Sequence, residues 1–217
     1  MTAARIGPGI PTPERDAARP EILTVGHSTH SAARLIELLR AHAVTALADV
    51  RSTPYSRRHP QFNRDRLRDV LEAAGIEYVF LGKELGARSE DDACYEKDQV
   101  QYERLARTPV FASGIDRLLE GSRRYRIAVM CAEHEPLDCH RTILVARHLV
   151  RAGARVSHIL RDGSLEAHAI TLGRLIRGLA LDQPHEADLF GHIAEAAEEA
   201  YERRGRRIAY RRASRTP

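Results

Sequence analysis

The chain has 217 residues, of which 43% are hydrophobic and 29% are charged, and this composition is typical of one globular domain with or without an appendage. No apolar run approaches the roughly 18 residues of a membrane span, and the N-terminus lacks the basic-then-apolar pattern of a secretory signal. The chain has three cysteines, Cys94, Cys131 and Cys139, and an odd number cannot all pair in disulfide bonds. We therefore expect a cytoplasmic protein with no membrane partner.

The charge is unevenly distributed along the chain. The formal net charge is +4, from 34 basic and 30 acidic residues, but residues 203–217 hold seven of the arginines and no acid. The remaining 27 basic and 30 acidic residues leave the rest of the chain at −3. The arginine-rich segment predicts either a salt-dependent nucleic-acid contact or a solvated tail or helix lying on the protein's own acidic surface. We favour the second interpretation.

Strand and helix patterns alternate along the chain after a proline-rich start. Residues 1–20 hold four of the ten prolines and predict a flexible leader. Short apolar runs predict strands at 22–25, 44–50, 76–81, 127–131 and 156–160. One-faced apolar patterns, bounded by capping residues and glycines, predict helices at 32–41, 63–75, 98–106, 108–121, 138–153, 164–179 and 186–203.

This alternation predicts an α/β fold. We expect a mostly parallel sheet of about five strands with helices on both faces, a Rossmann-like three-layer sandwich, followed by a helical C-terminal extension. The α/β domain is expected to span 21–180, and the C-terminal helix with its arginine-rich tail 181–217. Because sites in such sheets lie at the carboxyl ends of the strands, polar residues after the first, second and fourth strands are expected to meet at one edge.

The segment Cys131–Arg141 follows the fourth predicted strand and ends in the first turn of a helix that Asp138 is expected to cap. Unpaired N–H groups and the helix dipole favour an anion there, and Arg141 adds a bidentate donor. The same field is expected to lower the pKa of Cys139, so that Cys139 or Cys131 is a candidate nucleophile. The alternative is that Cys131 is a buried strand residue and Asp138 merely a cap.

A metal site built from Cys131, His134 and Cys139 is the weaker alternative for this segment. Zinc takes about three protein ligands in catalytic sites and about four in structural ones. The adjacent Cys139 and His140 are not expected to point at one ion, and the chain lacks two Cys-x-x-Cys pairs. We therefore predict no metal and leave the cofactor unassigned.

Two further loops bring polar side chains to the same edge of the predicted sheet. His27 follows the first strand and has a pKa near neutrality that suits a general base, whereas Ser28 is a candidate ligand or helix cap. Asp49 follows the second strand, where it can orient His27 or Arg141, and Arg51 can bind the charge of a substrate. The alternative is an internal ion pair between Asp49 and an arginine that shapes the loop.

Several separated motifs agree in order with one known family. Thr24–Ser28, Asp49–Arg51 with Pro54 and Ser56, Leu81–Gly86, and Cys131–Arg141 together resemble the bacterial family known as domain of unknown function 488 (DUF488). The resemblance runs from about residue 21 to 163 and continues weakly to 188–190. It implies a cytosolic α/β domain without a settled reaction. It also implies a single site, formed by His27, Ser28, Asp49, Arg51, Cys131, Glu133, Cys139, His140 and Arg141.

The sequence therefore predicts an enzyme that acts on an anionic, phosphate-bearing or nucleotide-like small molecule. The alternative is a non-catalytic ligand-binding or regulatory module, associated with nucleic acid through 203–217. The oligomeric state is not predicted. The candidate catalytic residues are Cys131, Cys139, His27, His140, Asp49 and Glu133. The candidate ligand-binding residues are Ser28, Arg51, Ser56 and Arg141.

Overall fold

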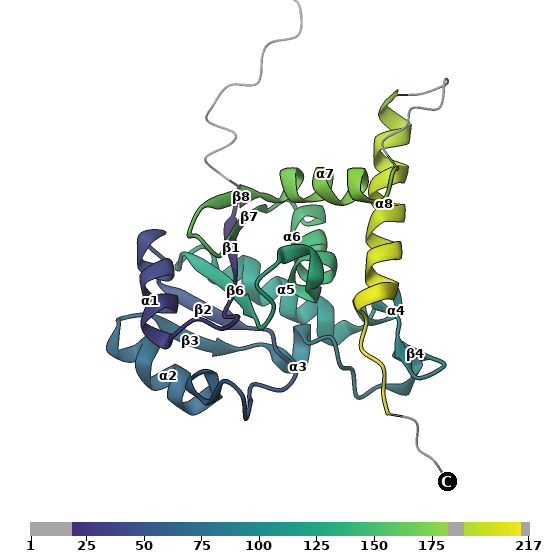
Figure 1. Ribbon diagram of the computed structural model, residues 1–217. Helices are drawn as coiled ribbons and strands as arrows, with labels where there is room; N and C mark the ends of the chain where they lie inside the picture. Colours follow the sequence, from purple (N-terminus) through teal and green to yellow (C-terminus); the bar gives the residue numbers. More distant parts are fainter. Residues whose placement is uncertain (1–18, 182–188, 214–217) are drawn as a thin grey trace, which may run out of the picture.

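The computed structural model describes residues 19–181 and 189–213 and arranges them around one six-stranded sheet (Figure 1). Its strands are β1 (Glu21–Gly26), β2 (Ala46–Asp49), β3 (Glu77–Phe80), β6 (Ile127–Cys131), β7 (Arg155–Ile159) and β8 (Leu165–Ala167). Their order in the sheet is β3-β2-β6-β1-β7-β8, and all neighbours are parallel except β7 and β8. A separate hairpin is formed by β4 (Tyr95–Glu96) and β5 (Gln99–Val100).

Helices fill the segments between the strands and follow the last one. The α-helices are α1 (Ala32–Ala41), α2 (Arg64–Ala73), α3 (Gly82–Leu85), α4 (Tyr102–Ala106), α5 (Pro109–Gly121), α6 (Arg147–Arg151), α7 (His168–Gly178) and α8 (Leu189–Ile208). A π-helical segment, η5 (Arg141–Ala146), leads directly into α6. Short 3-10 turns are η2 (Pro60–Phe62), η3 (Asp92–Cys94) and η4 (Pro136–Asp138).

Alternate residues of the sheet face two separate cores. Leu23 and Val25 of β1 pack with the apolar faces of α1 and α2, whereas Ile22 packs with α5, η5 and α6 on the opposite side. Figure 1 shows these two groups of helices on either side of the strands. Strands covered on both faces are the usual form of parallel sheets. The predicted three-layer α/β sandwich is therefore confirmed.

The parallel register brings the carboxyl ends of β1, β2 and β6 together. Gly26 lies opposite Cys131, and Asp49 lies opposite Met130. A Cβ on Gly26 would lie only 1.8 Å from the carbonyl oxygen of Glu133, so a glycine is required where the loop after β6 crosses the end of β1. The polar residues that follow these strands consequently share one edge of the sheet.

The predicted strands all form within two residues of their expected bounds, but the helix expected at 164–179 is wrong at its start. Residues Leu165–Ala167 instead form β8, and the helix begins at His168. The edge of the sheet at β7 is open to a further strand, so pairing there competes with an early helix start. The helix expected from residue 98 is likewise preceded by β5 and begins at Tyr102.

Asp138 and Asn63, the first residues of the helices expected at 138–153 and 63–75, do not act as side-chain caps. Asp138 does not cap a helix, because η4 ends at this residue, Cys139 is extended, and the helical turns begin at Arg141. Its carboxylate instead forms an ion pair with Arg204. Asn63 stands at the cap position of α2, but its side-chain oxygen accepts a hydrogen bond from the backbone N–H of Ser56.

The described part of the arginine-rich segment lies against the protein. Arg204 of α8 pairs with Asp138, and Arg212 pairs with Asp92. The interpretation favoured above, a terminal helix on the protein's own acidic surface, agrees with these contacts, and the nucleic-acid interpretation stays a prediction. Residues 1–18 of the expected leader and 214–217 of the expected tail lie outside the described residues.

Among the described helices, none has both the length and the apolar character needed to cross a membrane.

Candidate functional site

Three buried side chains converge at the end of β6. One ligand atom each from Cys131, Cys139 and His140 lies within 4.8 Å of the others. The Nδ1 atom of His140 is 3.5 Å from the Cys131 sulfur and 4.0 Å from the Cys139 sulfur. We call these three residues the cysteine–histidine cluster.

The expectation that Cys139 and His140 cannot point at one centre is wrong. Cys139 is extended, with φ −131° and ψ 140°, whereas His140 is helical, with φ −62° and ψ −24°. This change of backbone conformation turns two consecutive side chains to the same side. His134, the third ligand of the predicted metal alternative, is not part of the cluster.

The ring of His140 is held in one orientation by the backbone. Its Nε2 atom lies 3.1 Å from the carbonyl oxygen of Val50, and a carbonyl can only accept a hydrogen bond. Nε2 therefore carries the proton. In the neutral ring Nδ1 is then unprotonated, and its lone pair is directed at the two sulfurs.

The two cysteines differ in acidity. Burial opposes ionisation of Cys139, but a hydrogen bond from Cys131 and the positive charge of Arg141 outweigh it and hold the pKa of Cys139 well below its usual value. The backbone N–H of Arg141 also donates to the Cys139 sulfur, at 3.4 Å. The hydrogen bond with Cys139, together with burial, raises the pKa of Cys131. Cys139 is consequently the more acidic thiol of the pair.

Arg141 holds the loop that joins the two cysteines. Its guanidinium group is fully buried and donates to the carbonyl oxygens of Glu133, at 2.5 Å, and His134, at 3.0 Å. Both terminal nitrogens are thus engaged by backbone within the described residues. The expected role of Arg141 as an anion ligand stays a prediction, and in this structure the loop between the cysteines curls over the guanidinium group.

Asp49 and Arg51 form an internal ion pair at the end of β2. Arg51 donates from Nε to one carboxylate oxygen at 2.9 Å and from Nη2 to the other at 2.6 Å. Tyr78 donates to the same carboxylate at 2.9 Å. This is the alternative that the sequence analysis left open for Asp49, and it neutralises the charge of Arg51 within the protein.

His27 lies beside this ion pair and is neutral. Burial, followed by the positive charge of Arg51, lowers the pKa of His27 to about 4. Its Nδ1 donates to the carbonyl oxygen of Ser28 at 3.0 Å, and its Nε2 accepts from Arg51 at 3.2 Å. The ring also stacks on Phe62 with 4.2 Å between centroids. With both nitrogens engaged, His27 contributes to the shape of the loop in this structure.

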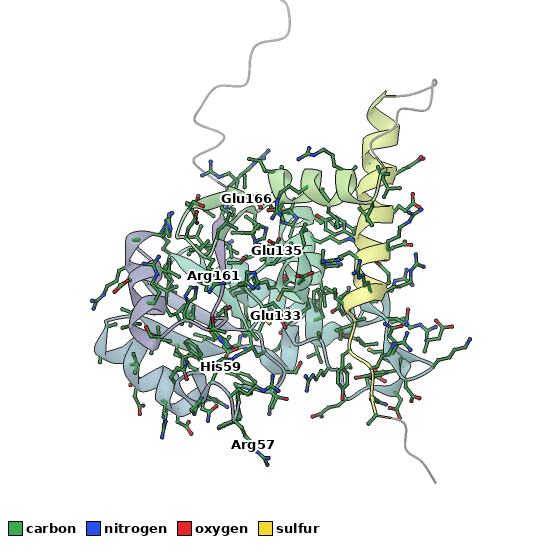
Figure 2. All side chains as sticks on the ribbon, viewed as in Figure 1. Arg57, His59, Glu133, Glu135, Arg161 and Glu166 are labelled. Carbon is green, nitrogen blue, oxygen red and sulfur yellow. The ribbon has the colours of Figure 1, made fainter. Side chains whose placement is uncertain are left out.

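Two cavities lie on either side of the loop after β6. The first, which we call the cysteine cavity, has a volume of about 240 Å³ and is lined by Cys131, His140 and Glu133 together with Arg88 and Tyr210. The second, which we call the histidine cavity, has a volume of about 340 Å³, and its lining includes His27, Ser28, His59, Glu133 and His134. Glu133 therefore lines both cavities, and Figure 2 shows it between Glu135 and His59 in this view.

Glu133 lines the cysteine cavity beside members of the cysteine–histidine cluster. Glu133 is exposed at the surface as a residue, but its carboxyl group interacts with the sulfurs of Cys139 and Cys131. Partial desolvation of this group, followed by the charge of Cys139, raises its pKa. Ser56, by contrast, lines neither cavity. Its hydroxyl accepts the backbone N–H of His59 at 3.2 Å, which supports the turn before η2. The structure therefore brings Glu133, but not Ser56, to the cluster.

Arg88, Tyr102 and Tyr210 line the cysteine cavity although the sequence analysis did not name them as site residues. The guanidinium group of Arg88 lies 4.5 Å from the centre of the Tyr210 ring and has no ion-pair partner among the described residues. Arg88 ends the stretch Leu81–Arg88, which follows the third predicted strand. Its position after a strand could therefore have indicated that Arg88 lies near the site. Tyr210 reaches the cavity only because the chain after α8 pairs with β5, where Val100 donates to its carbonyl oxygen.

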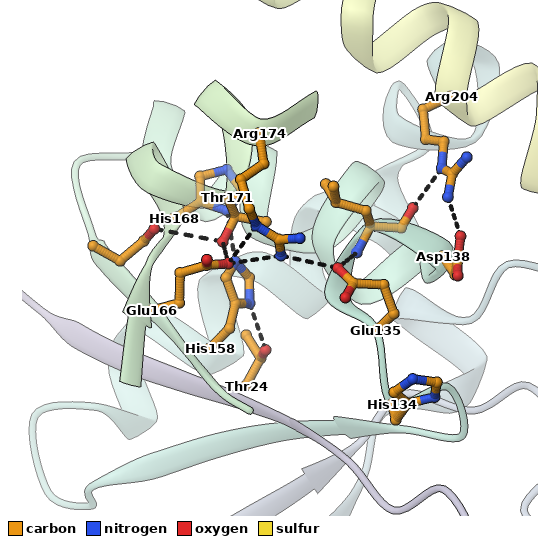
Figure 3. A network of polar contacts seen from close by, with 12 residues as sticks. Thr24, His134, Glu135, Asp138, His158, Glu166, His168, Thr171, Arg174 and Arg204 are labelled. Atoms are coloured by element: carbon orange, nitrogen blue, oxygen red, sulfur yellow. Dashed lines mark hydrogen bonds and ion pairs between the residues drawn. The ribbon is translucent and has the colours of Figure 1, made fainter. Parts of the chain in front are cut away.

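The two C-terminal helices anchor the loop between the cysteines (Figure 3). Arg174 of α7 binds Glu135 at 3.0 Å and Glu166 at 2.8 Å. Arg204 of α8 donates to the carbonyl oxygen of Leu137 at 2.8 Å and pairs with Asp138. The loop is therefore fixed from outside by these two arginines and from inside by Arg141.

The family described as "Domain of unknown function DUF488" has a model that matches residues 31–148, which is more than half of the chain. The matched range contains the cysteine–histidine cluster, Glu133 and Arg88. It begins after Thr24–Ser28, the first of the motifs on which the resemblance was based. Comparison with curated proteins and with solved structures finds no match for this chain.

Proposed function

Because this chain belongs to the DUF488 family, whose description names no reaction, we propose from its site alone that it is an enzyme acting on an anionic small molecule. One observation carries the proposal. The buried cysteine–histidine cluster opens on a cavity that also holds an acid and an unpaired arginine. Convergence of such groups in one cavity is the usual composition of an active site.

The anion is assigned to Arg88. Two arginines line the cysteine cavity, and the charge of Arg51 is already neutralised by Asp49. Arg88 has no ion-pair partner among the described residues, and its planar guanidinium group suits bidentate recognition of a phosphate or carboxylate. A bound anion would supply the negative charge that the Arg88 guanidinium group does not receive from the described residues.

The reacting part of the substrate is placed next to Cys131, His140 and Glu133. Cys131 and His140 are the cluster members that line the cysteine cavity, and the Glu133 carboxyl group lies beside them. A carboxyl group in this position can exchange a proton with a bound substrate. The described cysteines are free and buried, and we include a reduced cytoplasm in the proposal because it preserves free thiols.

The experiment uses the full chain and a panel of phosphomonoesters, nucleotides and small carboxylates. Binding is measured by thermal shift, and consumption by mass spectrometry of the mixture. We expect one class of anion to be bound and consumed by the native protein, and bound but not consumed by Glu133→Gln. Binding without consumption by the native protein would contradict catalysis and support the regulatory module that the sequence analysis left open.

A further inference from the structure

We propose that Cys131, Cys139 and His140 bind one divalent ion of the zinc class, with a fourth coordination position that faces the cysteine cavity. Thiolate and imidazole are the ligands that zinc prefers in proteins. Two cysteines and one histidine with one open position form a known type of catalytic zinc site. The inference concerns the same residues as the proposed function, but metal binding is testable without any substrate.

The distances between the donors fit a shared ion. Tetrahedral coordination with zinc–sulfur bonds of about 2.3 Å and zinc–nitrogen bonds of about 2.0–2.1 Å places two sulfurs roughly 3.8 Å apart, and a sulfur and a nitrogen roughly 3.5 Å apart. The two sulfur–nitrogen distances here are 3.5 Å and 4.0 Å, and all three donor atoms lie within 4.8 Å of one another. Little rearrangement is needed to bring them onto one centre.

The surroundings of the donors also fit a metal centre. Metal-binding histidines usually donate their other ring nitrogen to a carbonyl or carboxylate, which fixes the tautomer. His140 does this through Nε2 to Val50, so that Nδ1 keeps its lone pair for the cluster. The Cys139 sulfur accepts a backbone N–H from Arg141, a contact that stabilises a thiolate ligand. All three ligands are buried.

The loop between the two cysteines holds its shape through contacts outside the cluster. Arg141 donates to two of its carbonyl oxygens, and Arg174 and Arg204 hold it from α7 and α8. A preformed site of this kind loses less conformational freedom on binding an ion than a flexible loop does. The loop thus maintains the spacing of the two sulfurs independently of the ion.

One side of the cluster remains open. Cys131 and His140 line the cysteine cavity, and the Glu133 carboxyl group stands beside the sulfurs on the same cavity wall. An ion at the cluster would act as a Lewis acid toward a group bound in the cavity. This last step rests on the proposed function, whereas the binding of the ion does not.

Metal content and cobalt spectroscopy test the inference on the full chain purified without an affinity tag. We expect about one equivalent of zinc per chain by elemental analysis, as for one mononuclear site. Replacing zinc with Co²⁺ should give a sulfur-to-cobalt charge-transfer band and intense tetrahedral d–d bands. Cys94→Ala is the matched control, because Cys94 is a buried cysteine outside the cluster, and it should retain both signals.

Cys131→Ser and His140→Gln should each lose most of the bound metal and change the cobalt spectrum. Loss of metal from a misfolded variant would not be informative, because either substitution can disturb the fold. The inference is therefore judged by the cobalt spectrum of the folded native protein. Folded native protein that takes up neither ion would overturn the inference, and selective alkylation of its Cys139 or Cys131 would favour a thiol nucleophile instead. Turnover by metal-free protein would contradict the Lewis-acid role of the ion but not its binding, whereas metal-loaded protein without turnover would contradict only the proposed function.

Discussion

Two groups of buried side chains in this molecule use histidine in opposite ways. In one, Thr24, His158, His168 and Tyr201 form a linear chain of hydrogen bonds of 2.7, 3.0 and 2.7 Å. Figure 3 shows the first part of this chain. Each ring nitrogen has one partner, so the chain is satisfied within the protein.

The cysteine–histidine cluster is arranged differently. Its donor atoms converge on one point instead of pairing in series, and two of its members line a cavity. Burial of a histidine is therefore not by itself a sign of function. What distinguishes His140 from His158 is that the Nδ1 of His140 shares its surroundings with two sulfurs, whereas each nitrogen of His158 bonds one neutral partner. Four predictions test this distinction, beginning with the largest expected effect.

Glu133→Gln should reduce kcat on the substrate found by the anion panel by about 10²–10⁴-fold, the usual contribution of a positioned acid or base. The amide is isosteric with the carboxyl group but cannot exchange the proton, so substrate binding should persist. Steady-state kinetics measures both quantities. Glu90→Gln is the control, because Glu90 is exposed and lies outside the cysteine cavity. An equal loss of activity in both variants would argue against a catalytic role for Glu133.

The hydrogen-bonded chain should instead make folding sensitive to acid. Burial lowers the pKa of His168 from 6.5 to about 4. The unfolded chain therefore binds a proton that the folded chain excludes, and stability present above pH 6.5 is lost as the pH falls toward 4. The loss should reach about 3 kcal/mol for this group. Urea unfolding between pH 7 and pH 4 measures it, and His168→Gln should remove this share of the pH dependence while leaving the share of His27, whose pKa is also lowered to about 4. An unchanged slope in the variant would show that His168 is not the group responsible.

Arg88→Met should raise KM by about 10–100-fold and change kcat much less, since a hydrogen bond to a charged group contributes about 1.5–3 kcal/mol. Methionine keeps most of the length of the side chain without its charge. Arg57→Met is the matched control, because Arg57 is exposed and does not line the cysteine cavity (Figure 2). Partial rescue by Arg88→Lys would support charge recognition. If Arg88→Met leaves KM at the native value, the anion binds elsewhere.

Arg174→Met should have the smallest effect, about 1 kcal/mol on the free energy of unfolding, because its ion pairs with Glu135 and Glu166 are partly exposed. The same change loosens the loop between the cysteines from α7. We therefore expect a few-fold weaker cobalt affinity, measured by competition with a chelator, with little change in the cobalt spectrum. A changed coordination spectrum would mean that Arg174 shapes the ligand geometry itself.

Much of the fold could be predicted from local sequence. The apolar run Ile127–Cys131 and the helix 32–41 were predicted at their observed bounds, because the apolar pattern and the flanking polar residues agree there. The strand β8 could not be predicted in this way. Three residues carry too little pattern, and their strand conformation depends on pairing with β7.

The site was only partly predictable. The rule that parallel strands end at one edge correctly brought Cys131, Asp49 and His27 near one another. The convergence of Cys139 with His140 depends on a backbone change between two neighbouring residues, which no spacing rule reports. The roles of Arg51 and Arg141 could not be separated from sequence either. Arg51 follows the end of β2 and Arg141 begins η5, and both positions suit an anion ligand. Their observed partners, a carboxylate for Arg51 and two carbonyls for Arg141, are fixed by tertiary structure.

The most direct test of the cysteine–histidine cluster as a reactive centre is anomalous diffraction at the zinc edge from crystals of the native full chain. We expect one peak at about 2.3 Å from the sulfurs of Cys131 and Cys139 and at about 2.0–2.1 Å from Nδ1 of His140. We also expect the fourth ligand to lie in the cysteine cavity, on the side of Glu133. A metal peak elsewhere, or ordered cysteine side chains with no peak between them, would contradict this expectation.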